Sequence, residues 1–331
     1  QFKKMKNMYL IKKYIYIFFL YFFLFFLLIF DLVIKKYEYT HTFFIKPNQT
    51  LNHITKNLYK EKIIDNKFFF KFIIRLTLAD KTLKAGEYKF YNNNIFQIIK
   101  KIKIGDAYQR RITIPEGLTS KEIVEIIKKK EGIVIDEKKS KKIIKEGTLF
   151  PSTYFYAYGT NFNIIIDTME KKMISTLINA WENRSKDLGL NNYDDVLTLA
   201  SLIEKETSLN YEKSKIAQVF LNRLRLNMKL QSDPSVIYGI EKELGIEKKE
   251  LKKKDLNHKS DFNTYLNRGL PKGPICNPGT ESILAVTNSS KGDLLYFVAN
   301  GKGGHNFSSD YKTHLENIDK LKKINNQKYE N

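Results

Sequence analysis

Residues 194–207 read DDVLTLASLIEKET, and their apolar spacing predicts a single helix packed against a core. Four apolar side chains recur at helical intervals and form the expected buried stripe: Val196, Leu199, Ala200 and Ile203. Either Asp194 or Asp195 is expected to cap the amino end of this helix. Helices are predicted to continue as far as Leu230.

Two glutamates stand near the carboxyl end of this helix, and the helical repeat separates them. At roughly 100° per residue, Glu204 and Glu206 lie about 160° apart, so they cannot form a close carboxylate pair in one cleft. Glu206 is in the last turn, where the helix dipole and partial burial both favour its protonated form. Glu204 lies deeper in the helix, where Lys205 or a backbone group is expected to hold it ionised. Glu206 is therefore the candidate general acid. The alternative for each is a surface carboxylate paired with lysine.

The amino-terminal part contains a long apolar run. Residues 14–34 extend for roughly 30 Å as a helix, which is enough to cross a bilayer. More lysines precede this run than follow it, so the amino terminus is expected to be cytoplasmic. We predict a cytoplasmic tail at residues 1–13 and a retained transmembrane anchor at residues 14–34. A cleaved signal peptide is the alternative, but the run is long and no small-residue cleavage site follows it.

The exported part begins with a predicted small α/β module at residues 40–106. Residues 42–45 alternate like a strand, Thr50 is placed to cap a helix, and a second helix is expected at 66–78. A further strand is expected within 83–90. This size and order are similar to wall-binding modules of the LysM type, whereas the alternative is a plain spacer.

A second exported unit is predicted to begin with a strand near residues 111–114. The strand leads through a turn into a helix that Thr119 or Ser120 caps. Residues 146–154 read EGTLFPSTY, which predicts a shaped loop beside a pocket.

The composition excludes several classes of function. The formal net charge is +21, but the excess is spread over many lysines and arginine is scarce, so no dedicated nucleic-acid role is expected. A basic surface would suit an anionic membrane or an acidic wall polymer. The single cysteine, Cys276, excludes an internal disulfide framework. No ligand set for a metal and no phosphate-binding loop is evident, so neither a metal nor a cofactor is expected.

Eight strings follow one another along nearly the whole exported chain. They are LKAGEY (83–88), EGTLFPSTY (146–154), LASLIEKET (199–207), VFLNRL (219–224), LQSDPSVIYG (230–239), NTY (263–265), GLPKGPICNPG (269–279) and YFVANGKGGHNF (296–307). Together they resemble the MltG/YceG-like endolytic murein transglycosylases. The chain departs from that pattern at Ser152, where an acid is common, and at Asp261-Phe262, which precede Asn263 where Ser-Pro-Tyr is usual.

The resemblance implies an α+β fold with a transmembrane helix, a LysM-like module and a mainly helical, lysozyme-like catalytic domain with short strands. The catalytic region would span residues 108–325, with its helical core at about 190–325. The family's catalytic glutamate falls on Glu206. It would protonate the bond between N-acetylmuramic acid and N-acetylglucosamine and then deprotonate the muramic C6 hydroxyl. The product would be a 1,6-anhydro end, formed without water.

Other polar residues within these strings are expected to line the glycan groove, with local structural roles as the alternative. They are Gln231, Ser232, Asp233, Asn222, Tyr238, Asn263, Tyr265 and His305. The resemblance further implies a lyase that cuts nascent peptidoglycan strands, affects strand length and has partners among the cell-wall synthesis proteins. It would be a single-pass protein of the bacterial cytoplasmic (inner) membrane with its catalytic domain on the outer side. Two alternatives remain, a non-catalytic wall-binding scaffold and a water-using hydrolase of lysozyme type.

Overall fold

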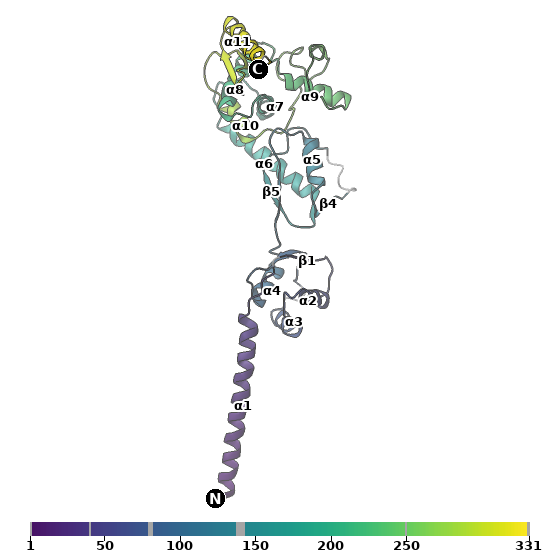
Figure 1. Ribbon diagram of the computed structural model, residues 1–331, viewed down its shortest axis with the longest axis vertical. Helices are drawn as coiled ribbons and strands as arrows, with labels where there is room; N and C mark the ends of the chain where they lie inside the picture. The colour runs from purple at the N-terminus through teal and green to yellow at the C-terminus, as the bar shows by residue number, and fades with distance from the viewer. Residues whose placement is uncertain (1, 40, 79–81, 137–142, 249, 330–331) are drawn as a thin grey trace. The chain divides into compact units, whose positions relative to one another are not determined.

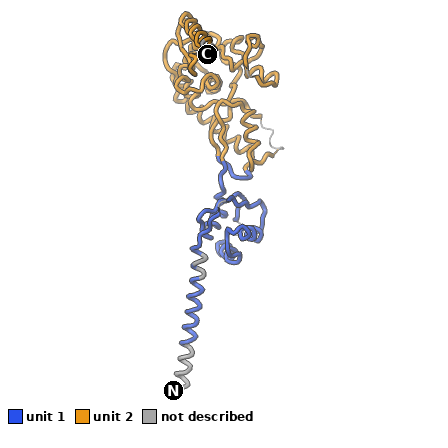
Figure 2. The backbone as a smooth tube through the Cα atoms, in the orientation of Figure 1, with its two compact units in different colours: residues 1–110, 155–159 blue, residues 111–154, 160–331 orange. Residues whose placement is uncertain are grey.

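The protein consists of helices and short paired strands, which confirms the α+β class (Figure 1). The computed structural model describes residues 2–39, 41–78, 82–136, 143–248 and 250–329. The chain divides into two compact units (Figure 2). Unit 1 comprises residues 1–110 and 155–159, and unit 2 comprises residues 111–154 and 160–331.

Unit 1 begins with a long helix, α1 (Phe2–Ile34), of 33 residues, which is purple in Figure 1. The side chains from Tyr14 to Leu27 on this helix are exposed. Within the described part of the chain, no helix combines the length and the apolar character that crossing a bilayer requires. The anchor expected at residues 14–34 therefore stays a prediction.

The rest of unit 1 is a small module with its own apolar core. Its elements are β1 (Thr42–Ile45), α2 (Leu51–Lys60), α3 (Lys67–Leu76), β2 (Gly86–Lys89) and α4 (Ile95–Ile104). The two strands pair antiparallel, with Phe43 opposite Tyr88. Thr50 caps α2 by accepting a hydrogen bond from the backbone N–H of His53, and Asn66 caps α3 in the same way. The predicted order of strand, helix, helix and strand is thus confirmed, and α4 is an addition to it.

Unit 2 contains most of the remaining elements. From the unit boundary onward the chain forms β3 (Arg110–Thr113), α5 (Ser120–Lys128), β4 (Ile133–Val134), β5 (Thr153–Tyr156), β6 (Thr160–Asn161), α6 (Phe162–Glu182), α7 (Tyr193–Glu206), α8 (Asn210–Arg225), α9 (Asp233–Leu244), a 3-10 helix (Lys253–Asn257), α10 (Thr280–Thr287), β7 (Tyr296–Ala299), β8 (His305–Ser308) and α11 (Tyr311–Tyr329). The strands form the pairs β3–β5, β4–β6 and β7–β8. As expected, Thr119 caps α5, and Glu122 completes a capping box with it.

Helix α7 lies at the centre of unit 2, among α6, α8 and α10. Every residue from Val196 to Ile203 is buried, so the helix is enclosed on all sides rather than along one stripe. Ser201, a polar residue in this run, is satisfied internally. Ser201 is fully buried and its hydroxyl donates to the carbonyl of Thr198 at 2.7 Å. It also accepts a hydrogen bond from the backbone N–H of Ile275 at 3.0 Å.

The expected cap of α7 was wrong. The helix begins earlier than predicted, and its N-cap is Asn192, whose side chain accepts from the backbone N–H of Asp195 at 2.9 Å. The carboxylate of Asp195 instead accepts from the backbone N–H of Asn191 at 2.9 Å. Asp194 and Asp195 therefore lie in the first turn, where negative charge is favourable for the helix dipole.

Candidate active site

Glu206 is the last residue of α7, and its position is fixed by how that helix ends. Thr207 leaves the helix in an extended conformation, with φ −149° and ψ 141°. Its hydroxyl accepts a hydrogen bond from the backbone N–H of Leu209 at 3.1 Å, which starts the turn into α8. The Glu206 side chain is partly buried at this corner.

Ser232 holds the Glu206 carboxyl directly. The buried Ser232 hydroxyl donates to Oε1 of Glu206 at 2.5 Å. Ser232 is also the N-cap residue of α9, but its side chain makes no capping hydrogen bond to that helix. A hydroxyl that usually serves a helix end is thus directed to the carboxyl instead.

The turn that carries Ser232 is strained and firmly held. Gln231 has a φ of +52°, a left-handed conformation that is uncommon outside glycine. Thr264 secures both residues, because its carbonyl accepts from Gln231 N–H at 3.2 Å and its hydroxyl accepts from Ser232 N–H at 2.9 Å. Arg223 donates through Nη1 to the carbonyl of Leu230 at 2.8 Å. Such strain persists only where the surroundings determine the backbone, as they do at many functional sites.

The surroundings of Glu206 raise its pKa, so that the carboxyl stays protonated up to near neutral pH. Burial raises its pKa from the usual 4.5 to about 7. The hydrogen bond from Ser232 works in the opposite direction, the charge of Asp233 raises the pKa further, and the charge of Arg223 lowers it. The helix dipole is not decisive here, because the carboxyl end of α7 and the amino end of α9 meet at this carboxyl and act in opposite senses. The raised pKa expected from the sequence is confirmed, with burial as its main cause.

Exposed polar groups adjoin this carboxyl. The Tyr265 hydroxyl donates to Oδ1 of Asp233 at 2.5 Å. Asp233 and Gln231 are both exposed, on either side of Ser232 in the sequence. Glu206, Ser232, Asp233 and Tyr265 thus lie together, with Gln231 next to Ser232 in the chain, and their role in lining a groove stays a prediction.

Two other predicted groove residues have structural roles. Asn263 is fully buried, and its amide nitrogen donates to the carbonyls of Leu256 and His258 at 2.9 and 2.8 Å. Asn222 is also buried, and its amide nitrogen donates to the carbonyls of Gly292 and Leu294. Their placement in the groove is therefore corrected, because the Asn263 amide binds the backbone of its own loop and the Asn222 amide, on α8, binds the backbone of the segment before β7.

His305 acts on the corner that follows Glu206. Its Nδ1 lies 2.7 Å from Oε2 of Glu212, and its backbone N–H donates to Oε1 of the same carboxylate at 2.8 Å. Thr207 donates to that carboxylate as well, at 3.3 Å. Burial works to raise the pKa of Glu212, but the hydrogen bonds from His305 outweigh it and lower the pKa. His305 therefore reaches Glu206 only indirectly, through Glu212 and Thr207, the residue that follows Glu206.

Tyr238, the last of the predicted groove residues, faces a second buried carboxyl. Its hydroxyl lies 3.4 Å from Oε2 of Glu146. Glu146 also accepts from the backbone N–H of Ser120 at 2.7 Å and from the Asn277 amide at 3.2 Å. Burial raises the pKa of Glu146, and its hydrogen bonds with Ser120, Gly147 and Tyr238 oppose the rise. The shaped loop expected at residues 146–154 is therefore anchored by its first residue.

Comparison with known proteins identifies the chain. Residues 43–320 match the profile of the YceG-like family. The chain belongs to the YceG-like family. The endolytic murein transglycosylase of Bacillus subtilis (strain 168) is 31% identical to it over 314 residues, which are 86% of this chain and 85% of that protein.

Two further YceG-like relatives extend the comparison. The endolytic murein transglycosylase of Streptococcus pneumoniae serotype 2 (strain D39) is 37% identical over 177 residues, 52% of this chain but 31% of that protein. The crystal structure of a YceG-like protein from Listeria monocytogenes is 31% identical, with a TM-score of 0.52. That match covers 85% of this chain and 99% of the Listeria chain. The family suspected from the eight strings is thus confirmed.

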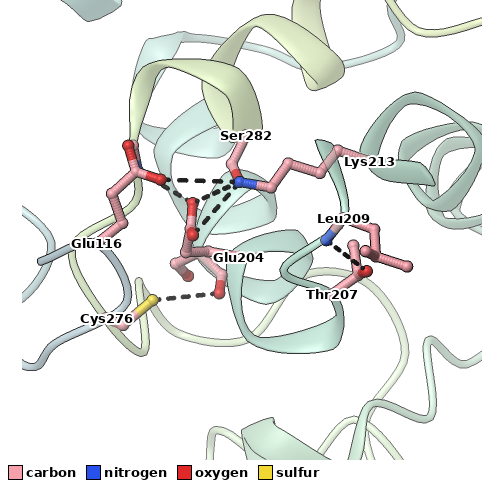
Figure 3. A network of polar contacts seen from close by, with 9 residues as sticks. Glu116, Glu204, Thr207, Leu209, Lys213, Cys276 and Ser282 are labelled. Carbon is pink, nitrogen blue, oxygen red and sulfur yellow. Dashed lines mark hydrogen bonds and ion pairs between the residues drawn. The ribbon is translucent and has the colours of Figure 1, made fainter. Parts of the chain in front are cut away.

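The other glutamate of the YceG-like Glu-Lys-Glu string, Glu204, belongs to a separate polar network (Figure 3). Its carboxylate accepts from the Ser282 hydroxyl at 2.6 Å and from the backbone N–H of Gly279 at 3.1 Å. Buried Lys213 lies 3.3 Å from it and 3.9 Å from Glu116. Burial, followed by the charge of Glu204, raises the pKa of Glu116. This network joins α7, α8 and α10.

The expected partner of Glu204 is corrected in one respect. The predicted backbone group is present, but the cation is Lys213 of α8 rather than Lys205. Lys205 is exposed, and its ammonium lies 3.4 Å from the carbonyl of Gly117. Glu204 and Glu206 have different partners, in agreement with their expected separation around the helix.

Sequence reasoning did not select two residues that shape the site. Arg223 and Thr264 both stand inside strings of the YceG-like pattern, and each holds the turn that carries Ser232. Their contacts join segments that are distant in the sequence. Helical spacing alone could not have revealed them.

Proposed function

We propose that this chain is an endolytic murein transglycosylase that cleaves MurNAc-β-1,4-GlcNAc bonds within nascent glycan strands and leaves 1,6-anhydro-MurNAc ends. The observation that carries the proposal is Glu206, a partly buried carboxyl with a pKa of about 7 that receives a hydrogen bond from Ser232. Family membership and the names of the Bacillus and Streptococcus relatives support it.

The first step requires an acid that still holds its proton near neutral pH. Glu206 donates this proton to the oxygen between the two sugars, and the bond from that oxygen to muramic C1 breaks. The pKa of about 7 places the donor close to the pH at which a general acid is most effective. The acetamido group of the substrate supports the positive charge that develops at C1.

The second step returns the proton to the same carboxyl. Ionised Glu206 removes the proton of the muramic C6 hydroxyl, and that oxygen bonds to C1 and closes the anhydro ring. A two-carboxylate glycosidase needs its second group as a nucleophile or to activate water. Here the nucleophile belongs to the substrate, so one carboxyl suffices. Ser232 would stabilise the ionised form between the two steps.

The exposed side chains of Gln231 and Asp233 and the half-buried side chain of Tyr265 would hold the sugar near Glu206. Gln231, Asp233 and Tyr265 can bind hydroxyl or acetamido groups, and the Tyr265–Asp233 hydrogen bond fixes the orientation of both side chains. Tyr238 and His305 would act farther out or through neighbouring residues. Cutting inside nascent strands would limit their length, and it gives a reason for contact with cell-wall synthesis proteins.

The location of the chain is part of the proposal. α1 would be a single-pass anchor in the bacterial cytoplasmic membrane, with the amino terminus inside and unit 2 on the outer side. Its exposed apolar side chains from Tyr14 to Leu27 support this assignment, and so do Lys12 and Lys13 before them. The strand–helix–helix–strand module supports a LysM-like wall-binding unit. Retention of the full chain on purified glycan strands, and its loss when the module is altered, would test that assignment.

The products of glycan cleavage test the reaction. The full-length chain is mixed with uncross-linked glycan strands, and the fragments are weighed by mass spectrometry. Anhydro ends are the expected result. Reducing ends would indicate a water-using hydrolase, and intact strands would indicate a non-catalytic scaffold. Glu206→Gln should abolish cleavage while the circular dichroism spectrum stays that of the parent, and cleavage by this variant would refute the site.

A further inference from the structure

Helix α3 of unit 1 exposes a ridge of large apolar side chains. Phe68, Phe72 and Leu76 are four residues apart, and they are 84%, 60% and 69% exposed. Leu78, just beyond the helix, is 80% exposed. Residues at this spacing lie one above the other on a helix, so the three form a continuous stripe. Exposed apolar surface of this extent usually marks an interaction site.

The exposed ridge is not needed for the core of the module. The opposite face of α3 carries Phe70, Ile73 and Ile74, which are buried in the core with α2 and α4. Phe69 is partly buried and packs against the same core. The helix therefore has an apolar face toward the module and a second apolar face toward the outside.

A row of cations runs beside the exposed ridge. Lys67, Lys71 and Arg75 are also four residues apart, so they line one flank of the apolar stripe. The sequence of α3 contains no acidic residue. Lys67 and Arg75 are exposed, and the Lys67 ammonium lies 4.6 Å from the centre of the Tyr59 ring of α2. Aromatic and cationic side chains combined in this way are typical of helices that lie at a membrane surface.

We propose that α3 contacts the surface of an anionic lipid bilayer. Phe68, Phe72 and Leu76 would enter the boundary between headgroups and acyl chains, while Lys67, Lys71 and Arg75 would pair with lipid phosphates. This contact is additional to the anchor proposed for α1 and rests on that anchor, which ends at Ile34 and holds the module close to the bilayer.

Charge favours lipid over a second copy of the chain as the occupant. Two copies that packed ridge against ridge would bring their cationic rows together. The chain as a whole has a net charge of +21, so self-association on a basic face would be repelled, whereas an anionic surface would attract it.

Lipid-dependent quenching at one position tests the contact. Phe72→Cys is labelled with an environment-sensitive fluorophore, and the full chain is reconstituted in vesicles of phosphatidylglycerol and phosphatidylcholine that contain a nitroxide-labelled acyl chain. The only natural cysteine, Cys276, is fully buried, so the label goes to the new thiol. Asn52→Cys, on the exposed surface of α2, is the matched control. We expect strong quenching at position 72 and little at position 52.

Removal of the cations tests the lipid chemistry. Substitution of Lys67, Lys71 and Arg75 by glutamine should abolish most of the quenching at position 72, as should high salt. Substitution of three other exposed lysines of unit 1, Lys56, Lys60 and Lys100, removes the same charge and should leave the quenching unchanged. Equal loss in both triple variants would show that net charge alone is responsible and would contradict the inference.

Flotation of the vesicles separates this inference from the proposed anchor. A chain that floats with the vesicles but shows no quenching at position 72 retains its anchor and overturns the α3 contact. A chain that does not float overturns the anchor, and the α3 contact with it. The quenching is also measured in vesicles of pure phosphatidylcholine. If it equals the quenching in the anionic mixture, the proposed attraction of the cations to anionic lipid is contradicted. None of these outcomes bears on glycan cleavage, which is measured separately.

Discussion

At the level of single residues, the candidate site depends on how one carboxyl holds its proton. Folding raises the pKa of Glu206 from 4.5 to about 7, mainly through burial. Between these values the folded state binds more protons than the unfolded state, so stability falls as the pH rises through this window. Above about pH 7 the Glu206 carboxyl is ionised in both the folded and the unfolded state. The folded state then carries the full free-energy cost of burying that charge. A functional carboxyl of this kind is expected to reduce stability.

Glu206→Gln should therefore abolish cleavage and stabilise the fold at alkaline pH. Glutamine keeps the shape and can accept from Ser232, but it carries no buried charge. We expect a gain of about 2 kcal/mol above pH ~7 that shrinks toward acidic pH. Urea unfolding of the variant and the parent across this range measures the difference. A gain that does not depend on pH would show that burial of the charge is not its source.

Ser232→Ala should shift the pH dependence of cleavage. The hydroxyl of Ser232 lowers the pKa of Glu206, so its removal raises that pKa. Because the acid must be protonated, the alkaline limb of the rate profile should move to higher pH, while the maximum rate falls as the ionised form loses its donor. Rates of strand cleavage across a range of pH values measure both effects.

Ser235→Ala is the matched control for this change. Ser235 is fully buried in the same turn, but its hydroxyl donates to the Ser232 carbonyl at 2.7 Å and does not contact Glu206. Its loss should cost about 1 kcal/mol of stability and leave the alkaline limb in place. An equal shift in both variants would assign the effect to the turn rather than to the hydrogen bond.

The candidate site could be predicted from the sequence in part. The choice of Glu206 as the acid followed from helix geometry and from the family resemblance. Both can be read from residues that are neighbours in the sequence. Asn222 and Asn263 were misplaced because an amide that binds sugar and an amide that binds backbone carbonyls look the same in a sequence. Only the burial of the amide and its hydrogen-bond partners distinguish the two roles. Burial and partners are both set by segments that come together in the folded chain.

At the level of elements, the sequence predicts helices best where one face is polar. α2 and α5 have that pattern together with the expected caps. α7 is buried on all sides, so the prediction of one buried stripe included too few of its residues. α4 carries Ile95, Ile98, Ile99 and Ile102 at helical spacing and a capping box at Asn94, so its signal was present but not used.

Asn277 illustrates how one side chain joins elements of unit 2. It is fully buried, its Oδ1 accepts from the backbone N–H of Leu149 at 2.7 Å, and its amide nitrogen donates to the carbonyl of Leu118 at 2.9 Å. Asn277→Ala should leave the buried N–H of Leu149 without its acceptor and cost about 3 kcal/mol, while the Leu118 carbonyl keeps its hydrogen bond from the backbone N–H of residue 277. Asn179→Ala, on the exposed face of α6, should change stability by less than about 0.5 kcal/mol. Chemical unfolding measures both, and similar losses would refute the bridging role.

At the level of the whole molecule, two apolar cores define two units. The sequence predicted a module at residues 40–106 and a second region from residue 108, close to the boundary at Arg110. It did not predict that residues 155–159 belong with unit 1. The Tyr158 ring packs against Phe44 and lies beside the Arg110 guanidinium, and local sequence patterns carry no information about such contacts between distant segments.

The two cores predict separate responses to mutation in the full chain. Ile98→Ala removes a fully buried side chain from the core of unit 1, and Leu199→Ala does the same in the core of unit 2. Each cavity should cost about 2–5 kcal/mol in its own unit. Calorimetry in detergent should therefore show two unfolding transitions, with Ile98→Ala lowering the midpoint temperature of one and Leu199→Ala that of the other.

Because Leu199 packs within the helix that ends at Glu206, its loss should also reduce glycan cleavage, whereas Ile98→Ala should leave the rate unchanged. A single transition lowered equally by both substitutions would show that the cores unfold together and that the division into units has no thermodynamic counterpart.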